Sequence, residues 1–111
     1  MRQAYEVTWS ETAERDLYAI VEYIADDSPQ RAYEMFKELR KKASSLRSFP
    51  DRGRILPELQ QQGITQYREL ITTLWRIIYR ISERKVYVLS VLDCRRSVED
   101  ILLRRFIDLK L

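Results

Sequence analysis

The sequence contains no histidine and a single cysteine, Cys94, among its 111 residues. Without histidine the chain lacks the side chain that most often acts as an acid or base near neutral pH, and the commonest metal ligand. A lone cysteine forms no internal disulfide and supplies too few ligands for a zinc site. We therefore expect no metal and no cofactor. The arginines beside Cys94 would lower the pKa of its thiol, but a catalytic thiol needs a base partner that histidine does not supply here.

Turn-forming residues are also scarce. The chain has two glycines and three prolines, so long regular elements should dominate over sharp turns. No apolar run reaches the roughly 18 residues of a membrane-spanning helix, and the N-terminus shows no apolar signal segment. We expect a single domain over residues 1–111 that is cytoplasmic and does not associate with a membrane.

The positive charge is concentrated in the C-terminal part of the chain. Residues 1–66 carry ten basic and eleven acidic side chains, whereas residues 67–111 carry ten basic and six acidic ones. The second part therefore suits an acidic partner protein, another acidic target or nucleic acid.

The first half of the chain has the pattern of one strand and two helices. Residues 5–9 alternate between apolar and polar side chains, which predicts a strand. Ser10 is a favourable N-cap, and the apolar residues that follow recur with the helical period. Ser28 and Pro29 are typical of a second helix start, with proline at the first helical position. The short link near residues 26–29 predicts an antiparallel helical hairpin over roughly residues 10–48.

The second half is predicted to form a loop, strands and a last helix. Residues 49–63 should be loop and irregular chain. Three strand-like runs follow, at residues 67–72, 74–81 and 85–93. The short polar link 82–84 predicts that the last two runs form a β-hairpin. A capping box at residues 97–100 predicts a final helix that runs from Val98 towards Asp108.

The element order is therefore β-α-α-β-β-β-α. It predicts an α+β fold in which an N-terminal strand, an antiparallel helical hairpin, a small largely antiparallel sheet and a C-terminal helix pack in two layers, with the helices on one face. The run 85–93 is apolar on both faces, which indicates an interior strand. We expect Val86, Val88 and Leu92 on one of these faces and Tyr87, Leu89 and Val91 on the other.

Five short blocks of sequence span nearly the whole chain. They are VTWSETAE at residues 7–14, FPDRGR at 49–54, YREL at 67–70, WRIIYR at 75–80 and VLSVLDCRR at 88–96. In this order they resemble the RelE/ParE superfamily of toxins from type II toxin–antitoxin systems, which includes plasmid stabilisation proteins. The resemblance implies a growth-inhibiting toxin that a cognate antitoxin neutralises by wrapping it. It also implies one of two activities: ParE-like members bind and poison DNA gyrase, whereas RelE-like members cleave messenger RNA in the ribosome.

A ribonuclease of this kind would use positive side chains on the sheet to stabilise the reacting phosphate. Arg76 matches the arginine of the family's central strand, Arg68 is a second candidate, and Arg95 or Arg96 is the candidate after the last strand. Arg76 and Arg80 lie four residues apart on one strand, so they would share a face and, with Arg95 and Arg96, offer a site for an anion or for the target. The alternative interpretation is that Arg76 and Arg80 belong to an ordinary solvent-facing strand surface, and that Arg95 and Arg96 lie in a solvated turn.

The proton donor that such ribonucleases place near the C-terminus is missing. No histidine occurs and no tyrosine follows Tyr87. Glu69 or Tyr79 would have to substitute, and nothing in the sequence places either at the phosphate. Together with the long helical hairpin and the extra final helix, this favours a ParE-like, non-enzymatic gyrase inhibitor, with a ribosome-dependent mRNA endoribonuclease as the alternative.

Two sets of exposed side chains are candidates for partner binding. Tyr18, Tyr23 and Tyr33 lie at the margins of the apolar helix stripes, where a wrapping partner would dock. Leu103, Ile107 and Leu111 form a second apolar row on the predicted last helix, on the side away from the row expected to face the sheet. The antitoxin or a second toxin chain would cover this row, in a toxin dimer or a toxin–antitoxin heterotetramer.

Overall fold

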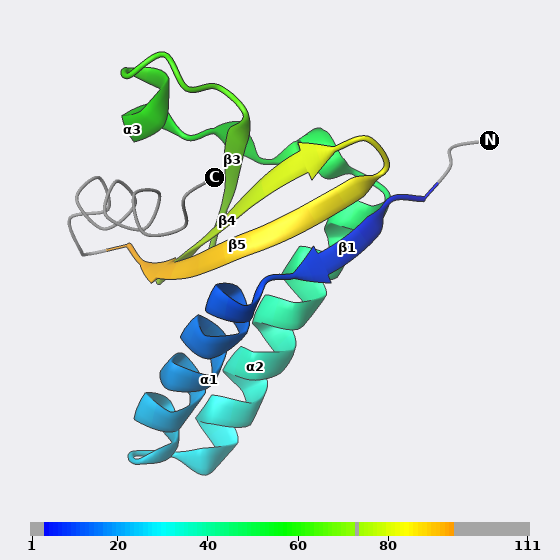
Figure 1. Ribbon diagram of the computed structural model, residues 1–111. Coiled ribbons are helices and arrows are strands. Elements are labelled where there is room, and N and C mark those ends of the chain that lie inside the picture. Colours follow the sequence, from blue (N-terminus) through cyan, green and yellow to red (C-terminus); the bar gives the residue numbers. More distant parts are fainter. Residues whose placement is uncertain (1–3, 73, 95–111) are drawn as a thin grey trace.

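The computed structural model describes residues 4–72 and 74–94 (Figure 1). Its elements are β1 (Glu6–Trp9), α1 (Glu11–Ala25), α2 (Pro29–Ser44), the 3-10 turns η1 (Ser45–Arg47) and η2 (Pro50–Arg52), β2 (Arg54–Ile55), α3 (Pro57–Gln60), β3 (Tyr67–Ile71), β4 (Trp75–Ser82) and β5 (Lys85–Asp93). The predicted final helix lies outside the described residues.

The predicted helical hairpin is confirmed by α1 and α2. The Ser10 hydroxyl accepts a hydrogen bond from the N–H of Ala13 at 3.0 Å, and the Ser28 hydroxyl accepts one from the N–H of Arg31 at 3.3 Å. Both serines thus satisfy backbone donors that the first helical turn leaves free. Pro29 is the first residue of α2, as predicted. None of the helices in the described part of the chain is long and apolar enough to span a bilayer.

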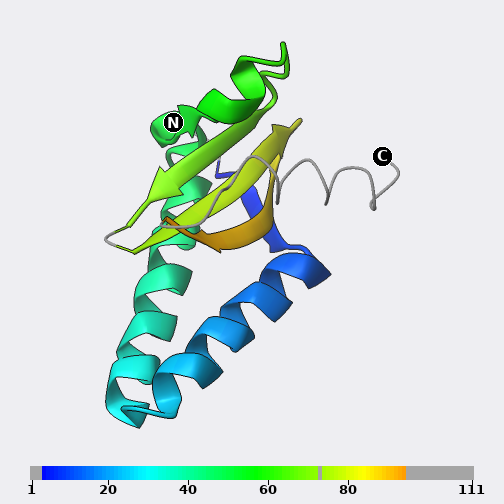
Figure 2. The same ribbon diagram turned by 90° about the vertical axis from the view of Figure 1, so that its left-hand side faces the viewer.

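The sheet has five strands in the order β1-β5-β4-β3-β2. The pairs β2–β3, β3–β4 and β4–β5 are antiparallel, whereas β1 pairs in parallel with β5. The sheet is therefore mixed, and β5 lies in its interior, as its two apolar faces predict. Figure 2 shows the hairpin of α1 and α2 extending from one side of this sheet.

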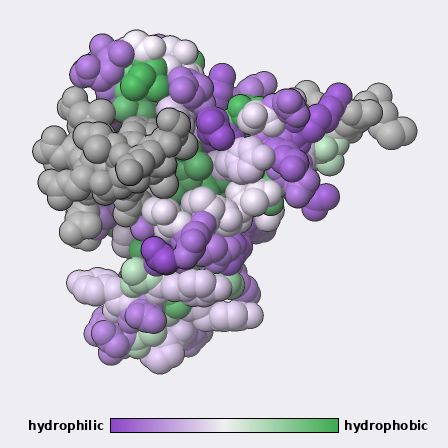
Figure 3. Space-filling model, viewed as in Figure 1, coloured by the Kyte–Doolittle hydropathy of each residue, from purple (hydrophilic) through white to green (hydrophobic). Residues whose placement is uncertain are grey.

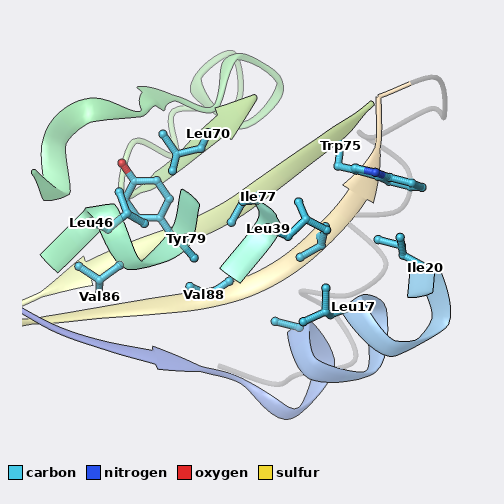
Figure 4. Close-up of a cluster of buried hydrophobic side chains, with 13 residues drawn as sticks. Leu17, Ile20, Leu39, Leu46, Leu70, Trp75, Ile77, Tyr79, Val86 and Val88 are labelled. Atoms are coloured by element: carbon cyan, nitrogen blue, oxygen red, sulfur yellow. The ribbon is translucent and has the colours of Figure 1, made fainter. Parts of the chain in front are cut away.

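The larger hydrophobic core lies between the hairpin and the sheet. Figure 4 shows Leu17, Ile20 and Leu39 of the helices facing Ile77 and Val88 of the strands. Most of the apolar stripe residues of α1 and α2 are buried here, which confirms the helical periodicity. Burial of each large side chain contributes roughly 1.5–3 kcal/mol relative to exposure, so this layer is the main source of stability.

A β-bulge in β5 changes which of its side chains share a face. Ile78 pairs with Ser90, but the next residue of β4 pairs with Val88, so Leu89 is left without an opposing residue. After this extra residue the alternation is shifted. Val91 therefore joins the helix-side core, whereas Leu92 packs on the opposite face. The predicted assignment of Val91 and Leu92 is wrong because the sequence pattern assumed uninterrupted alternation.

A second, smaller core lies on the other face of the sheet. Residues 49–63, predicted as irregular chain, contain β2 and α3, and α3 covers part of this face. The buried residues of this second core are Leu56, Leu59, Tyr67, Ile78 and Leu92. Helices thus lie on both faces of the sheet and not on one. In Figure 3 hydrophobic surface is visible around α3 and over the adjoining part of the sheet.

Candidate functional site

Arg76 lies at the centre of a network of ion pairs on the sheet face that α3 covers. Its Nη1 and Nη2 atoms donate to the two carboxylate oxygens of Glu58 on α3, at 2.7 and 2.8 Å. Its Nε atom donates to Oε1 of Glu69 on β3. The arginine is 8% exposed. Both edges of the guanidinium are therefore occupied by carboxylates of the protein itself.

Glu69 is the most deeply buried member of this network. It is 1% exposed, and its second oxygen accepts a hydrogen bond from Nε of Arg54 at 2.6 Å. The sheet register places the two partners, since Arg54 of β2 lies opposite Glu69 of β3. We call Arg54, Glu58, Glu69 and Arg76 the arginine–carboxylate network. It contains two cations and two anions, so their formal charges cancel.

The electrostatics of the network follow from these contacts. The hydrogen bonds from Arg76 hold the pKa of the Glu58 carboxyl below its usual range, although partial burial opposes this shift. The same hydrogen bonds raise the pKa of Arg76, with a further contribution from Glu69. Both groups are therefore charged near neutral pH. A phosphate would have to displace Glu58 to reach the same nitrogen atoms.

Tyr79 and Arg68 hold the loop before β2 from the helix side of the sheet. The Tyr79 hydroxyl donates to the carbonyl of Pro50 at 2.7 Å and accepts from the N–H of Gly53 at 2.9 Å. Burial raises the pKa of Tyr79. Nη1 of Arg68 donates to the carbonyl of Gly53 at 2.8 Å. Strand alternation places Arg68 and Arg76 on opposite faces, so the structure does not bring these two candidate cations together.

Arg80 shares the face of Arg76, as the spacing on β4 predicts. Its guanidinium lies 5.6 Å from the centre of the Tyr87 ring, a cation–π contact. Its Nε atom is buried and has no hydrogen-bond partner within the part of the chain that the structure describes. Tyr67, directly opposite Arg80 on β3, belongs to the second core. Arg80 thus sits in an aromatic setting, apart from the arginine–carboxylate network.

The chain resembles known proteins both in sequence and in fold. Residues 7–98 match the model of the ParE toxin of type II toxin–antitoxin systems, parDE. The chain belongs to the ParE toxin family. The predicted resemblance to the RelE/ParE superfamily is confirmed. The chain is also 30% identical, over 92 residues, to Toxin RelE2 of Caulobacter vibrioides, a match that covers 82% of this chain and 97% of that protein.

Two solved structures share the fold of this ParE-family chain. One is the chromosomal ParDE system of P. aeruginosa, with a TM-score of 0.66 and 17% identity, which covers 81% of this chain and 96% of that one. The other is the toxin–antitoxin complex RelBE2 of Mycobacterium tuberculosis, with a TM-score of 0.61 and 22% identity. This match covers 86% of this chain and 98% of that one. At these identities the likeness extends to the fold alone.

The candidate partner-binding tyrosines of this ParE-family domain are exposed. Tyr18 is 52% exposed, Tyr23 78% and Tyr33 61%. The Lys37 ammonium lies 4.8 Å from the centre of the Tyr33 ring. None of the three is among the buried residues of the hydrophobic core, and all three are accessible on the hairpin surface.

The remaining candidate site residues are Cys94, which the structure describes, and five residues that lie after it in the chain. Desolvation raises the pKa of the Cys94 thiol, and this effect outweighs the opposing charge of Arg76. The expected lowering rests on the two arginines that follow Cys94, and these lie outside the described residues. Arg95, Arg96, Leu103, Ile107 and Leu111 lie outside the described residues. Within residues 4–72 and 74–94, no three side chains of the metal-binding types cluster closely enough to hold an ion.

Sequence reasoning missed Glu58 and Arg54. Both lie in the stretch predicted as irregular chain, and Glu58 is 18 residues from Arg76 in sequence. A usable signal did exist. Glu69 occupies an inward position of a strand, and a buried carboxylate requires a positive partner. That requirement points to nearby arginines, although it does not say which of them turn towards it.

Proposed function

We propose that this chain is the toxin of a type II pair, that a cognate antitoxin holds it inactive, and that it arrests growth by binding DNA gyrase and not by cleaving messenger RNA. One observation carries the choice between the two activities. Arg76, the strongest candidate for a phosphate-binding arginine, is engaged on both edges by Glu58 and Glu69. The network it belongs to has no excess positive charge with which to stabilise a phosphate.

RNA cleavage needs a cation at the phosphate and groups that move protons to and from oxygen atoms. Glu69, one of the two substitutes for the missing histidine, is buried and paired with two arginines. Tyr79, the other, uses its hydroxyl to hold Pro50 and Gly53 on the opposite side of the sheet. Among the described residues, these positions support a structural role better than a catalytic one.

A single observation favours the ribonuclease alternative. The chain is 30% identical to a protein named Toxin RelE2, and the superfamily resemblance associates RelE-like members with cleavage of messenger RNA. Sequence identity at this level does not extend to the target, because small toxin domains of one fold serve different activities. The ion pairing of Arg76 is a property of this chain and therefore weighs more.

Two assays on the purified wild-type protein separate the activities. We expect it to inhibit the supercoiling of relaxed plasmid by purified gyrase, and to leave ribosome-bound message intact. Codon-positioned cuts in translated RNA, without an effect on gyrase, would replace the proposal with the ribonuclease. Arg76→Ala is unsuitable as a catalytic control, because it leaves Glu69 buried without its main partner and would destabilise the protein whatever its activity.

The antitoxin part of the proposal has its own test. Growth arrest by the expressed chain should be relieved when the neighbouring reading frame is expressed with it, and the two proteins should copurify. Growth arrest that persists beside every adjacent reading frame would contradict this part without affecting the gyrase assay.

A further inference from the structure

A groove of about 460 Å³ lies between the turn of the helical hairpin and the start of β4. None of the contacts described above accounts for it. Leu74 and Trp75 line it from the sheet, and Tyr23 and Ile24 line it from the end of α1. Figure 4 shows the Trp75 indole at the start of β4, beside Ile20 of α1. The groove is thus formed where the two layers of the fold diverge.

The walls of the groove are apolar and accessible. Leu74 is 39% exposed and Tyr23 is 78% exposed, while Ile24 and Met35 are half-buried. Large apolar side chains that stand together at the surface mark interaction sites more often than isolated ones do. A groove of this size accommodates one or two aliphatic side chains of a partner.

The indole of Trp75 is the most deeply buried wall of the groove. Trp75 is 9% exposed, and its Nε1–H is buried away from the groove surface without an acceptor among the described residues. The face of the ring therefore offers the groove an apolar contact, whereas its N–H does not reach a partner. Tryptophan is also one of the residues that most often dominate binding energy at interfaces.

The rim of the groove is acidic on a chain whose net charge is +3. Asp26 and Asp27 line it, against one cation, Arg31. These three side chains make no ion pair with each other or with other described residues, and the last turn of α1 contains no basic residue. An acidic partner would be repelled from this rim, whereas a basic segment would be attracted.

We infer that this groove is the surface through which the toxin holds its target, an inference that rests on the proposed gyrase function. The bound segment of gyrase presents an aliphatic side chain to Leu74 and Trp75, and a lysine or arginine to Asp26 and Asp27. The basic remainder of the toxin surface stays available to an antitoxin of acidic character.

The experiment compares two serine variants in the gyrase supercoiling assay. Leu74→Ser removes an apolar wall of the groove, and Ile71→Ser is its matched control. Ile71 is 47% exposed, is the last residue of β3, three positions before Leu74, and does not line the groove. We expect Leu74→Ser to raise the toxin concentration for half-inhibition about tenfold or more, as truncation of an interface anchor does, and Ile71→Ser to leave it unchanged.

A charge variant tests the groove without altering its apolar walls. Asp26→Asn combined with Asp27→Asn should weaken the inhibition of gyrase. The difference in inhibition between this variant and wild type should shrink as salt is raised, because salt screens the attraction between the two aspartates and the basic segment of gyrase. Melting curves establish that each variant is folded. Equal inhibition by wild type and all variants would overturn the inference while leaving the gyrase proposal standing. A wild-type protein that does not inhibit gyrase would overturn both.

Other occupants of the groove would be recognised by different readouts. If Leu74→Ser converts a dimer into monomers in sedimentation experiments, the groove is a contact between toxin chains and the inference is wrong. If Leu74→Ser abolishes copurification with the product of the neighbouring reading frame but leaves gyrase inhibition intact, the antitoxin occupies it, and the inference is equally wrong.

Discussion

Replacing Arg76 by leucine removes the main partner of a fully buried carboxylate. Glu69 is 1% exposed and, among the described residues, would keep only the Arg54 contact on one oxygen. Breaking a buried ion pair by deleting one partner costs about 3–5 kcal/mol, because the remaining charge stays buried without compensation. Arg54 offsets part of this cost, so we expect Arg76→Leu to lower the free energy of unfolding by about 3 kcal/mol. That is a large share of the roughly 5–15 kcal/mol that stabilises a domain of this kind.

Two control variants separate buried charge from lost contacts. Arg54→Ala removes a partner whose side chain is 60% exposed, so its cost should not exceed about 1 kcal/mol. The double variant Arg76→Leu with Glu69→Leu removes the buried charge together with its partner. It should be more stable than Arg76→Leu alone, because no buried carboxylate is left without a cation.

Urea unfolding, followed by circular dichroism, measures these differences in the free energy of unfolding. A shift of the urea midpoint reports a change in stability when the slope of that free energy against urea concentration stays the same. The reasoning would be refuted if Arg76→Leu cost less than Arg54→Ala. It would also be refuted if the double variant were less stable than the single one. Either result would mean that Glu69 is hydrated or protonated, and that its pairing with Arg76 does not stabilise the fold.

Three further predictions concern the same region. Tyr79→Phe leaves the Gly53 N–H and the Pro50 carbonyl without their partner, so thermal melting should report a loss of about 1–3 kcal/mol. Gly53→Ala places a Cβ atom 2.5 Å from both the Glu69 carbonyl oxygen and the Tyr79 hydroxyl. It should therefore destabilise the fold more than Gly63→Ala, where the backbone has a positive φ of 80° but an added Cβ atom meets no atom within 4 Å; a stability equal to wild type would contradict the close approach at Gly53. The pKa of Glu58 is lowered in the folded state from its usual 4.5, so its contribution is present above that pH and is lost as the pH falls through the folded pKa. Glu58→Gln should therefore be less stable than wild type at neutral pH, and the gap should close in strong acid.

Local features of the sequence were sufficient to predict the helical hairpin. Ser10, Ser28 and Pro29 mark the helix starts through contacts within a few residues, and the apolar period of α1 and α2 selects the face that is buried. The runs that became β3, β4 and β5 were predicted for the same reason. The candidate site was predicted less well. Arg76 was identified, but as a cation for an anionic ligand and not as the partner of two carboxylates.

The sequence by itself determined the family, the order of the main elements and the side of each helix that packs inward, because these depend on residues close together along the chain. Only the tertiary structure decided the bulge at Leu89, the small elements β2 and α3, and the pairing of Arg76 with Glu58 and Glu69. Strand alternation states which face of a sheet a side chain occupies, but not what packs over that face. The chain that covers Arg76 comes from a distant segment, so whether its charge is free or neutralised is decided by the packing of the whole domain.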